Sequence, residues 1–445
     1  MLHKLTPYKL ILGLLLVSTL GIAQSIEPVK YLKLEEAIEK ANQQNRAIQL
    51  AKMDETIAGS RLKQTDALYL PQVGLSYTAM STNNPLNAFG FKLQQKSISA
   101  ADFNPDLLNN PKSTPDFSTK LEVMQPIINL DMLYQKKAAE KQAEMYQYQT
   151  KRTKEAIQLE VQKAYLQLGL IHASIKVLKE ALATSKSVEV FTDNRFKQGL
   201  IQKSDLLNAQ LQVRSVETNL AKAQSNLGNA SDFMSLLMGQ TTGQLYTVDE
   251  IGSTSTQQVG LLTIASADRA DFMAMQKAID ATGLNILAAK KSYLPKLNAF
   301  GSYQLNDSRM LGFGANAYLA GVQLSWDIFK GNRTKNNIAT QVLEKNKLAS
   351  QLDQQKEQAQ LELGKTYRDL NNASYQRNQQ EKAVEQASES LRILQNRYQQ
   401  GLVNTTDVLM ATTQLAQQQL ALIQASYEKQ ISLAQIEFMT ATNKK

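Results

Sequence analysis

Four segments of the chain alternate between apolar and polar side chains, at residues 72–79, 120–123, 297–306 and 320–328. A period of two places alternate side chains on opposite faces of a β-strand. The pattern therefore predicts four strands, each with one apolar and one polar face. A water-soluble sheet with one buried face would give the same alternation, although lengths of about nine to ten residues also suit tilted strands that cross a membrane.

If these strands enter a membrane, their two faces have different surroundings. The apolar side chains are expected to face lipid, and they are Val73, Leu75, Tyr77, Leu297, Tyr303, Val322, Leu324 and Trp326. The polar side chains are expected to face water, and they are Lys120, Glu122, Gln304, Gln323 and Ser325. Trp326 is the only tryptophan, and an aromatic residue at a strand end is typical of the lipid interface of a barrel. An ordinary packed tryptophan is the alternative.

Unusually long helical segments follow the strands. Two segments of about 65 residues, at 130–191 and 332–395, would each be about 98 Å long at ~1.5 Å per residue. A shorter segment at 204–238 has apolar residues spaced alternately by three and four, which is the seam of a coiled coil. A similar seam runs through residues 405–440. The seam of the 204–238 segment consists of Leu206, Ala209, Val213, Val216, Leu220, Ala223, Leu227, Ala230, Met234 and Leu237.

The chain also repeats itself. A Tyr-Leu-Pro sequence precedes the first and third strands, at residues 69–71 and 293–295. The sequence Arg-Phe-Lys-Gln-Gly-Leu at 195–200 returns as Arg-Tyr-Gln-Gln-Gly-Leu at 397–402. Each half therefore has a helix, two strands, a long helix, a turn with a glycine and a closing helix.

These parts predict two structural repeats, at residues 24–258 and 259–445. The first helix of each repeat is expected at 34–68 and 261–293. The first repeat also has an insertion at residues 81–118 that is rich in Asn, Pro and Ser, and we expect a long outer loop there.

Composition excludes several kinds of function. The chain has no cysteine and two histidines, which rules out disulfides and thiolate chemistry and argues against histidine metal sites and Ser-His-Asp triads. It has no Gly-rich phosphate loop and no acid–base constellation, so neither an enzyme nor a cofactor is expected. The 49 Lys and Arg residues are interspersed with the 40 Asp and Glu residues, so nucleic acid is not an expected partner.

The first 23 residues have the pattern of a cleaved signal peptide. Lys4 and Lys9 precede an apolar segment at 10–20, and residues 21–23 form a small-residue cleavage site. The chain is therefore expected to be exported. No later run of about 18 apolar residues occurs, so no transmembrane helix is expected, and without cysteine no N-terminal lipid anchor is expected.

Four strands cannot close a transmembrane barrel by themselves. An open sheet edge in lipid leaves unpaired N–H and C=O groups that each cost several kcal/mol, and the smallest common barrels have eight strands. If the four strands cross a membrane, several chains must therefore share one barrel.

Taken together, these features resemble the TolC-like outer-membrane efflux proteins. The resemblance rests on the doubled Tyr-Leu-Pro sequence, on Trp-Asp-Ile-Phe-Lys-Gly at 326–331, and on the doubled Arg-(Phe/Tyr)-x-x-Gly-Leu-x-x-x-x-Asp-x-Leu. Segments 84–90 and 101–105 of the insertion are also similar to this family. The resemblance covers essentially the whole mature chain.

This resemblance implies the fold and the partners. The expected fold is mainly α with a small β part: an antiparallel coiled-coil barrel, plus four transmembrane strands per chain that complete a 12-stranded barrel in a homotrimer. The barrel would lie in outer-membrane lipid, with an α-helical tunnel through the periplasm. A periplasmic adaptor protein and an inner-membrane efflux pump or secretion transporter would dock at the tip of the tunnel.

The resemblance also implies that the repeated glycine turns form the tip and gate. The residues concerned are Phe196, Gly199, Asp205, Tyr398, Gly401 and Asp407. The glycines stand where a positive φ angle is often needed between helices. Asp407 matches an acidic ring position of the family and Tyr398 a linking tyrosine, whereas Met410 stands at a second acidic position. Asp205 and Asp407 would also complement the dipole of the helix that follows each turn. For Asp407, a role in the gate and a role at the helix N-terminus therefore both stay open.

An exported structural or adhesive coiled-coil protein without channel activity is the alternative. It would explain the heptads, but not the paired strands with their polar faces.

Overall fold

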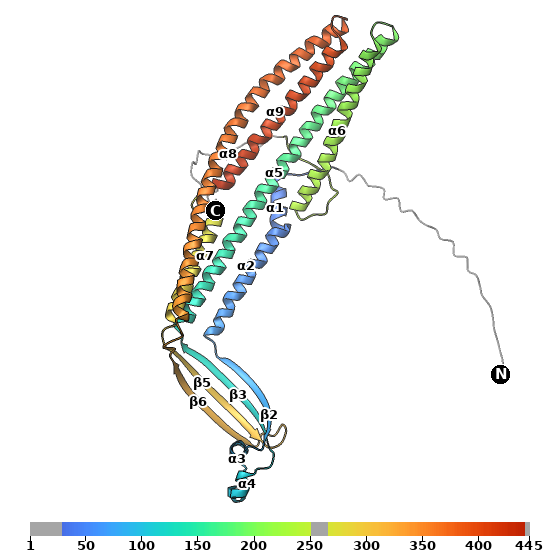
Figure 1. The fold of residues 1–445 in the computed structure, drawn as a ribbon. Coiled ribbons are helices and arrows are strands. Elements are labelled where there is room, and N and C mark those ends of the chain that lie inside the picture. Colours follow the sequence, from blue (N-terminus) through green and yellow to red (C-terminus); the bar gives the residue numbers. More distant parts are fainter. Residues whose placement is uncertain (1–28, 251–265, 441–445) are drawn as a thin grey trace, which may run out of the picture.

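The computed structural model describes residues 29–250 and 266–440 of the chain, which is drawn in Figure 1. A small sheet occupies one end of an elongated molecule. Long helices run from it to the other end, where two turns each connect a long helix to a shorter one. The predicted class, mainly α with a small β part, is confirmed. The expected signal peptide and the expected boundary between the repeats lie outside the described residues.

Two long helices run through most of the helical part. Helix α5 (Leu130–Lys197) has 68 residues and α8 (Arg333–Gln399) has 67, so each is about 100 Å long at ~1.5 Å per residue. Each forms a hairpin with a shorter helix, α6 (Lys203–Leu237) or α9 (Thr405–Thr440). Both long helices were predicted, and both continue a few residues further toward the tip than the pattern indicated.

The first helix is interrupted, which corrects the prediction of one helix at 34–68. The chain forms α1 (Leu34–Gln44) and α2 (Arg46–Gln64), with Asn45 in an extended conformation between them. The Asn45 side-chain oxygen accepts hydrogen bonds from two N–H groups of the first turn of α2, and its amide donates to the Leu237 carbonyl at 2.8 Å. The side chain therefore caps a new helix where α1 meets the end of α6.

The corresponding helix of the second repeat is shorter than predicted. Helix α7 (Ala270–Lys291) begins after the undescribed stretch and ends two residues earlier than the expected end at residue 293. A short 3-10 helix, η1 (Thr65–Leu68), ends the first helical stretch.

The helices form one layer of antiparallel neighbours. In the half near the sheet, α5 lies between α2 and α7, and in the other half it lies between α6 and α9, while α8 packs against α7 and α9. The predicted coiled-coil seam of α6 is confirmed, because six of its ten positions are buried and the other four are half-buried. The two repeats thus use the same arrangement, a long helix beside shorter ones stacked along it (Figure 1).

A small contact midway along the helices ties the ends of the first repeat together. Strands β1 (Lys30–Tyr31) and β4 (Tyr246–Thr247) pair in parallel. The Asp249 carboxylate accepts hydrogen bonds from the hydroxyls of Tyr31 (2.5 Å) and Tyr165 (3.0 Å). Burial raises the pKa of Tyr165 to about 12, and the hydrogen bond from Tyr31 lowers the pKa of Asp249. These three groups therefore hold the segments around Tyr31 and Asp249 against α5.

The sheet has four antiparallel strands in the order β2-β3-β5-β6. Their bounds are β2 (Gln72–Thr82), β3 (Thr114–Ile128), β5 (Lys296–Asp307) and β6 (Ala315–Ser325). All four predicted strands are present. Strands β2 and β6 each pair on one side only, so the sheet of a single chain has two open edges.

Two strand predictions need correction. The second strand, expected at 120–123, extends over 15 residues because it pairs with both β2 and β5. The fourth strand, expected to reach residue 328, ends at Ser325, opposite Lys296, the first residue of β5. Beyond that point none of the described residues of the chain forms a strand that pairs with it, so Trp326 lies just outside the strand.

The insertion at 81–118 is more ordered than the predicted loop. It contains α3 (Pro85–Gln94), the 3-10 helix η2 (Ala100–Phe103) and α4 (Pro105–Asn109), and its ends belong to β2 and β3. Prolines indicated a loop here, but two of them occupy the first position of a helix, where a missing N–H does no harm. Asparagines at 84 and 104 cap these helices.

Within residues 29–250 and 266–440, none of the helices combines the length and the apolar composition that a membrane crossing requires.

Candidate functional site

The first turn at the helical tip joins α5 to α6. The Gly199 N–H donates to the Phe196 carbonyl at 2.9 Å, and the Leu200 N–H donates to the Arg195 carbonyl at 3.0 Å. The φ angle of Gly199 is +72°. A left-handed residue followed by a hydrogen bond back across six residues is the Schellman end of a helix, and it favours glycine.

The second turn, between α8 and α9, repeats this geometry. The Gly401 N–H donates to the Tyr398 carbonyl at 3.0 Å, and the Leu402 N–H donates to the Arg397 carbonyl at 2.9 Å. The φ angle of Gly401 is +76°. The positive φ angles predicted for the two glycines are therefore present, and the duplication extends to single hydrogen bonds.

The Tyr398 hydroxyl links three helices at the second turn. It lies 2.9 Å from the Thr192 hydroxyl of α5 and 2.8 Å from the Thr405 hydroxyl of α9, and all three side chains are buried. The Thr192 hydroxyl donates to the Val188 carbonyl at 2.6 Å. Because each hydroxyl has one proton, the donors run in one direction, from Thr405 to Tyr398 to Thr192 to the carbonyl. Every proton in this hydroxyl chain has an acceptor.

Aromatic and basic side chains surround the hydroxyl chain. The rings of Phe191 and Tyr398 lie 4.9 Å apart, centroid to centroid. The Arg195 guanidinium lies 5.5 Å from the first ring centroid and 6.0 Å from the second. A Cβ atom at Gly401 would meet this guanidinium at 2.9 Å. The end of α5 therefore packs directly against the second turn.

Phe196 has the position in the first turn that Tyr398 has in the second. It is half-buried, whereas the tyrosine is 5% exposed, and it has no hydroxyl. With the repeat offset of 202 residues, the counterpart of Thr192 is Leu394, so neither member of a hydroxyl pair exists at that turn. The link between the two hairpins is therefore built once per chain.

The two predicted tip carboxylates lie in the first turn of their helices. The Asp407 side chain accepts a hydrogen bond from the Asn404 N–H at 3.2 Å, and the Asp407 N–H donates back to the Asn404 carbonyl. The Asp205 N–H donates to the Gln202 carbonyl in the same way. Asp407 and the neighbouring Met410 are exposed. Capping by Asp407 is therefore present, and its gate role stays a prediction.

Sequence reasoning did not find the partners of Tyr398. Thr192 and Thr405 are two of several buried polar side chains in α5 and α9, such as Ser185 and Thr412, so their type alone does not distinguish them. Arg195 was noted only as part of a motif. One signal was available: aligning the repeats sets a buried threonine against Leu394, and a polar residue at an apolar position of only one repeat indicates a specific contact.

The register of the sheet brings the predicted lipid-facing residues onto one face. Leu75 lies opposite Leu121, which lies opposite Tyr303, which in turn lies opposite Tyr318. Directly opposed residues share a face of an antiparallel sheet. The same counting puts seven of the eight predicted residues on this face: Val73, Leu75, Tyr77, Leu297, Tyr303, Val322 and Leu324. Trp326 follows the strand, and its indole N–H donates to the Tyr293 carbonyl at 2.9 Å.

The predicted water-facing residues all lie on the opposite face. Lys120 and Glu122 form an ion pair there, and the Gln304 amide donates to the Ser118 hydroxyl at 3.0 Å. The full predicted set is Lys120, Glu122, Gln304, Gln323 and Ser325. This face also has apolar members such as Phe300. The surroundings of each face stay a prediction.

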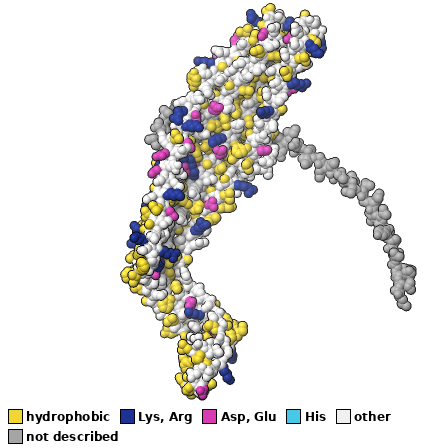
Figure 2. Space-filling model, viewed as in Figure 1, with side chains coloured by type: hydrophobic (Ala, Val, Ile, Leu, Met, Phe, Trp, Pro, Cys, Tyr) yellow, Lys and Arg dark blue, Asp and Glu magenta, His cyan; other side chains and the backbone are white. Residues whose placement is uncertain are grey.

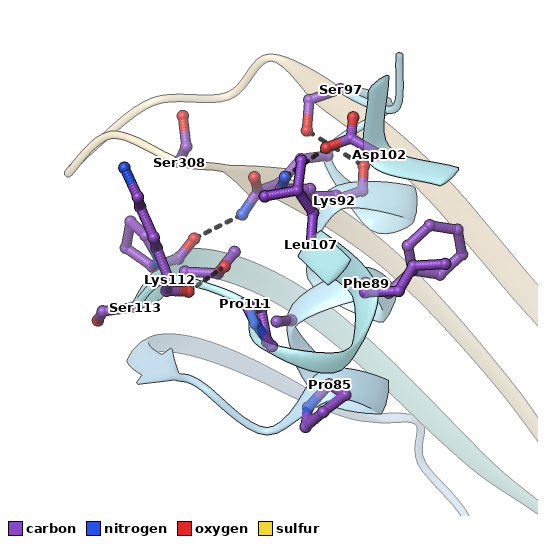
Figure 3. A pocket seen from close by; sticks show the side chains of 15 residues that line it. Pro85, Phe89, Lys92, Ser97, Asp102, Leu107, Pro111, Lys112, Ser113 and Ser308 are labelled. Atoms are coloured by element: carbon purple, nitrogen blue, oxygen red, sulfur yellow. Dashed lines mark hydrogen bonds and ion pairs between the residues drawn. The ribbon is translucent and has the colours of Figure 1, made fainter. Parts of the chain in front are cut away.

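The insertion lies at the end of the sheet that is far from the helices, where it lines an open pocket of about 450 Å³ (Figure 3). On one wall, Lys92 lies 2.5 Å from the Asp102 carboxylate. This hydrogen bond, with another from the Ser99 N–H, lowers the pKa of Asp102 to about 2. The Gln95 amide donates to Asp116 of β3 at 2.9 Å, so polar contacts fix the insertion to the sheet.

Charged and apolar side chains are distributed unevenly over the surface. Figure 2 shows basic and acidic side chains mixed with hydrophobic ones along the helical part, and few charged side chains over the sheet. Among the described residues there is no group of three or more His, Cys, Asp or Glu side chains that could hold a metal ion.

Comparison with known proteins identifies this architecture. The profile of the family "Outer membrane efflux protein" matches residues 37–240 and 261–442, once for each repeat. The cation efflux system protein CusC of Escherichia coli strain K12 is 22% identical over 403 residues, which cover 89% of this chain and 83% of CusC. A crystal structure of CusC superposes with a TM-score of 0.77 at 18% identity, covering 92% of each chain. VceC of Vibrio cholerae superposes at 0.73 with 19% identity, covering 92% of this chain and 96% of VceC.

The fold is thus that of the outer-membrane efflux proteins, two repeats of long helices with a small four-stranded sheet. Since the family profile covers most of its length, the chain belongs to the outer membrane efflux protein family.

Proposed function

We propose that this chain forms a trimeric outer-membrane channel with an α-helical tunnel in the periplasm, and that substrates leave the cell through it. The observation that carries the proposal is a four-stranded sheet with two open edges and one apolar face. Open edges in lipid are costly. Three chains of four strands give a closed barrel of twelve, whereas one chain cannot close.

The helical part supports a tunnel. Helices α5 and α8 are each about 100 Å long at ~1.5 Å per residue, and the shorter helices beside them keep the wall one layer thick. Such a length suits a passage across the periplasm. The proposed partners at the tip are a periplasmic adaptor protein and an inner-membrane efflux pump or secretion transporter, in keeping with the family.

The second turn is the proposed gate. The Tyr398 hydroxyl holds the turn to α5 through Thr192 and to α9 through Thr405. Three-fold symmetry would bring three Asp407 carboxylates toward one axis, and a ring of acids favours cations in a narrow pore. Opening would be an outward movement of the α8–α9 hairpin once the hydroxyl chain is broken.

The apolar face of the sheet is proposed to face lipid and the polar face the lumen. An arginine at the bilayer midplane costs ~2–4 kcal/mol on a lipid face. Tyr303 and Gln304 lie well inside β5, on opposite faces of the sheet. Tyr303→Arg should therefore weaken assembly strongly, while its neighbour Gln304→Arg should assemble normally and alter conductance. Heat resistance of the oligomer on gels measures the first effect. Equal tolerance of both substitutions would contradict the assignment of one face to lipid and the other to the lumen.

Mass measurement of the protein extracted from outer membranes in mild detergent tests the proposal as a whole. The expected mass is three times that of the processed chain. A folded monomer would contradict the shared barrel. Recovery as an elongated species without membrane or detergent would instead favour the structural coiled-coil protein.

A further inference from the structure

The two edges of the sheet are open in the described part of the chain. Strand β2 offers one edge and β6 the other. Val73 and Leu75 on β2 are 64% and 74% exposed, and Val322 and Leu324 on β6 are each 69% exposed. A second copy of the chain is the partner that supplies a complementary edge, because β6 of one copy can pair with β2 of the next.

The internal duplication makes the two hairpins of the sheet equivalent. The Tyr-Leu-Pro sequence precedes both β2 and β5. Gln72 opens the first hairpin opposite Met124, and Lys296 opens the second opposite Ser325. A residue of β2 therefore corresponds to the one 224 positions later in β5 (72 and 296), and a residue of β3 to the one 201 positions later in β6 (124 and 325).

The joint between the hairpins is observed within the chain. There Val123 of β3 lies opposite Gly301 of β5, and Leu121 lies opposite Tyr303. In a closed ring, every hairpin meets the next one. The joint from the second hairpin to the first hairpin of the next protomer is therefore the counterpart of the joint between β3 and β5.

We infer that β6 pairs with β2 of the neighbouring protomer in the register of this internal joint. The offsets set Leu324 opposite Tyr77 of the next copy, and Val322 opposite Ala79. This register rests on the proposed shared barrel, and it states how the barrel closes. It fixes one register among those that could join the two edges.

The faces of the strands agree with this register. Leu324, Val322, Tyr77 and Ala79 all lie on the apolar face of their own chain. A shift by one residue would set apolar side chains beside polar ones across the joint, because side chains alternate with a period of two. The two offsets were taken from the first residue pair of each hairpin and not from the faces of the side chains. The agreement of the faces is therefore a further check on the register.

The residues after β6 also fit this joint. Within the chain, β3 continues past the start of β2 and pairs there with β5, with Gln125 opposite Ala299. The counterpart of that extension begins at Trp326, which has no strand beside it in a single chain and is 60% exposed. The inferred register places it opposite Leu75 of the neighbour, on the apolar face, so assembly would lengthen β6.

Disulfide crosslinking tests the register, because the chain has no cysteine of its own. The register sets Gln323 opposite Thr78 of the neighbour, both on the polar face, where an oxidant in water can reach them. Opposed residues of antiparallel strands have Cα atoms about 4.5–5.5 Å apart, within the reach of a disulfide. The double variant Gln323→Cys/Thr78→Cys is therefore expected to give a covalent trimer on a non-reducing gel after oxidation in membranes.

Two matched variants shift the register by two residues and keep the face. They are Gln323→Cys/Ser76→Cys and Gln323→Cys/Met80→Cys, and both are expected to stay largely uncrosslinked. If a shifted pair crosslinks and the Thr78 pair does not, the register is overturned while the shared barrel stands. If no pair crosslinks although the variants keep the mass of a trimer, the edge pairing is overturned. A monomeric mass would overturn the proposed function itself.

Discussion

The two turns at the helical tip have the same backbone but different side-chain contacts. Gly199 and Gly401 have φ angles within a few degrees of each other and the same pair of turn hydrogen bonds. Phe196 contributes no hydroxyl at the first turn, whereas Tyr398 joins three helices at the second. Duplication thus preserved the fold of the turn, which needs only glycine and helix ends, while the link between hairpins is confined to one copy.

This difference has a consequence for the proposed ring of six hairpins. Three junctions, each inside one protomer, would contain the hydroxyl chain. At the other three, between protomers, the repeat offset sets Phe196 near Leu394 of the neighbour, so these junctions would be apolar. The comparison therefore predicts that changes at the second turn affect the closed tip more than the same changes at the first.

The largest expected effect is that of Thr192→Val. It leaves the buried Tyr398 hydroxyl without its acceptor, which costs ~1–3 kcal/mol. Hydrogen exchange of the turn peptide around residues 396–404 should accelerate by about fivefold to a hundredfold, since 1.4 kcal/mol is a factor of ten. Thr366→Val is the matched control, because that threonine is also buried but bonds only to the Glu362 carbonyl in its own helix. Equal acceleration by both changes would mean that the link contributes nothing.

The glycine substitutions compare the turns directly. Alanine in a left-handed conformation costs ~1–2 kcal/mol, so Gly199→Ala and Gly401→Ala should both loosen their turns. A Cβ at Gly401 also displaces the Arg195 guanidinium, whereas nothing lies within 4 Å of a Cβ at Gly199. Exchange of the turn peptides should therefore accelerate somewhat more at the second turn. A larger effect at the first turn would contradict the tighter packing inferred for the second.

The smallest effect on stability is expected from the aspartates. Asp205→Ala and Asp407→Ala each remove a favourable charge at a helix N-terminus, worth ~0.3–1 kcal/mol. The two should differ in ion preference, because only Asp407 is proposed to line the pore. The reversal potential in a salt gradient should show a weaker cation preference for Asp407→Ala than for the wild type. For Asp205→Ala, the cation preference should equal that of the wild type. An unchanged reversal potential in both would leave Asp407 as a helix cap only.

Local patterns predicted the parts of this molecule well. Alternation set the faces of all four strands, because a period of two is a property of neighbouring residues, and the 3,4 spacing set the seam of α6. The repeated motif predicted both turns to within a few residues. Prolines misled at residues 85 and 105, where they begin helices α3 and α4 after capping asparagines.

Contacts between distant segments were not predicted from the sequence. Asn45 breaks a helix by bonding to a carbonyl 192 residues away, and the end of β6 is set by the first residue of β5. Thr192 and Tyr398 are 206 residues apart. None of these pairings has a local signature, because each depends on how the helices and strands pack.

Single-channel conductance in planar bilayers shows whether the second turn holds the proposed channel closed. Tyr398→Phe keeps the ring against Phe191 and removes only the hydroxyl, and Phe196→Tyr is the reciprocal change at the first turn. We expect a higher conductance for trimeric Tyr398→Phe than for the wild type, and a wild-type conductance for Phe196→Tyr. A wild-type conductance for Tyr398→Phe, or an equal rise in both variants, would contradict this expectation.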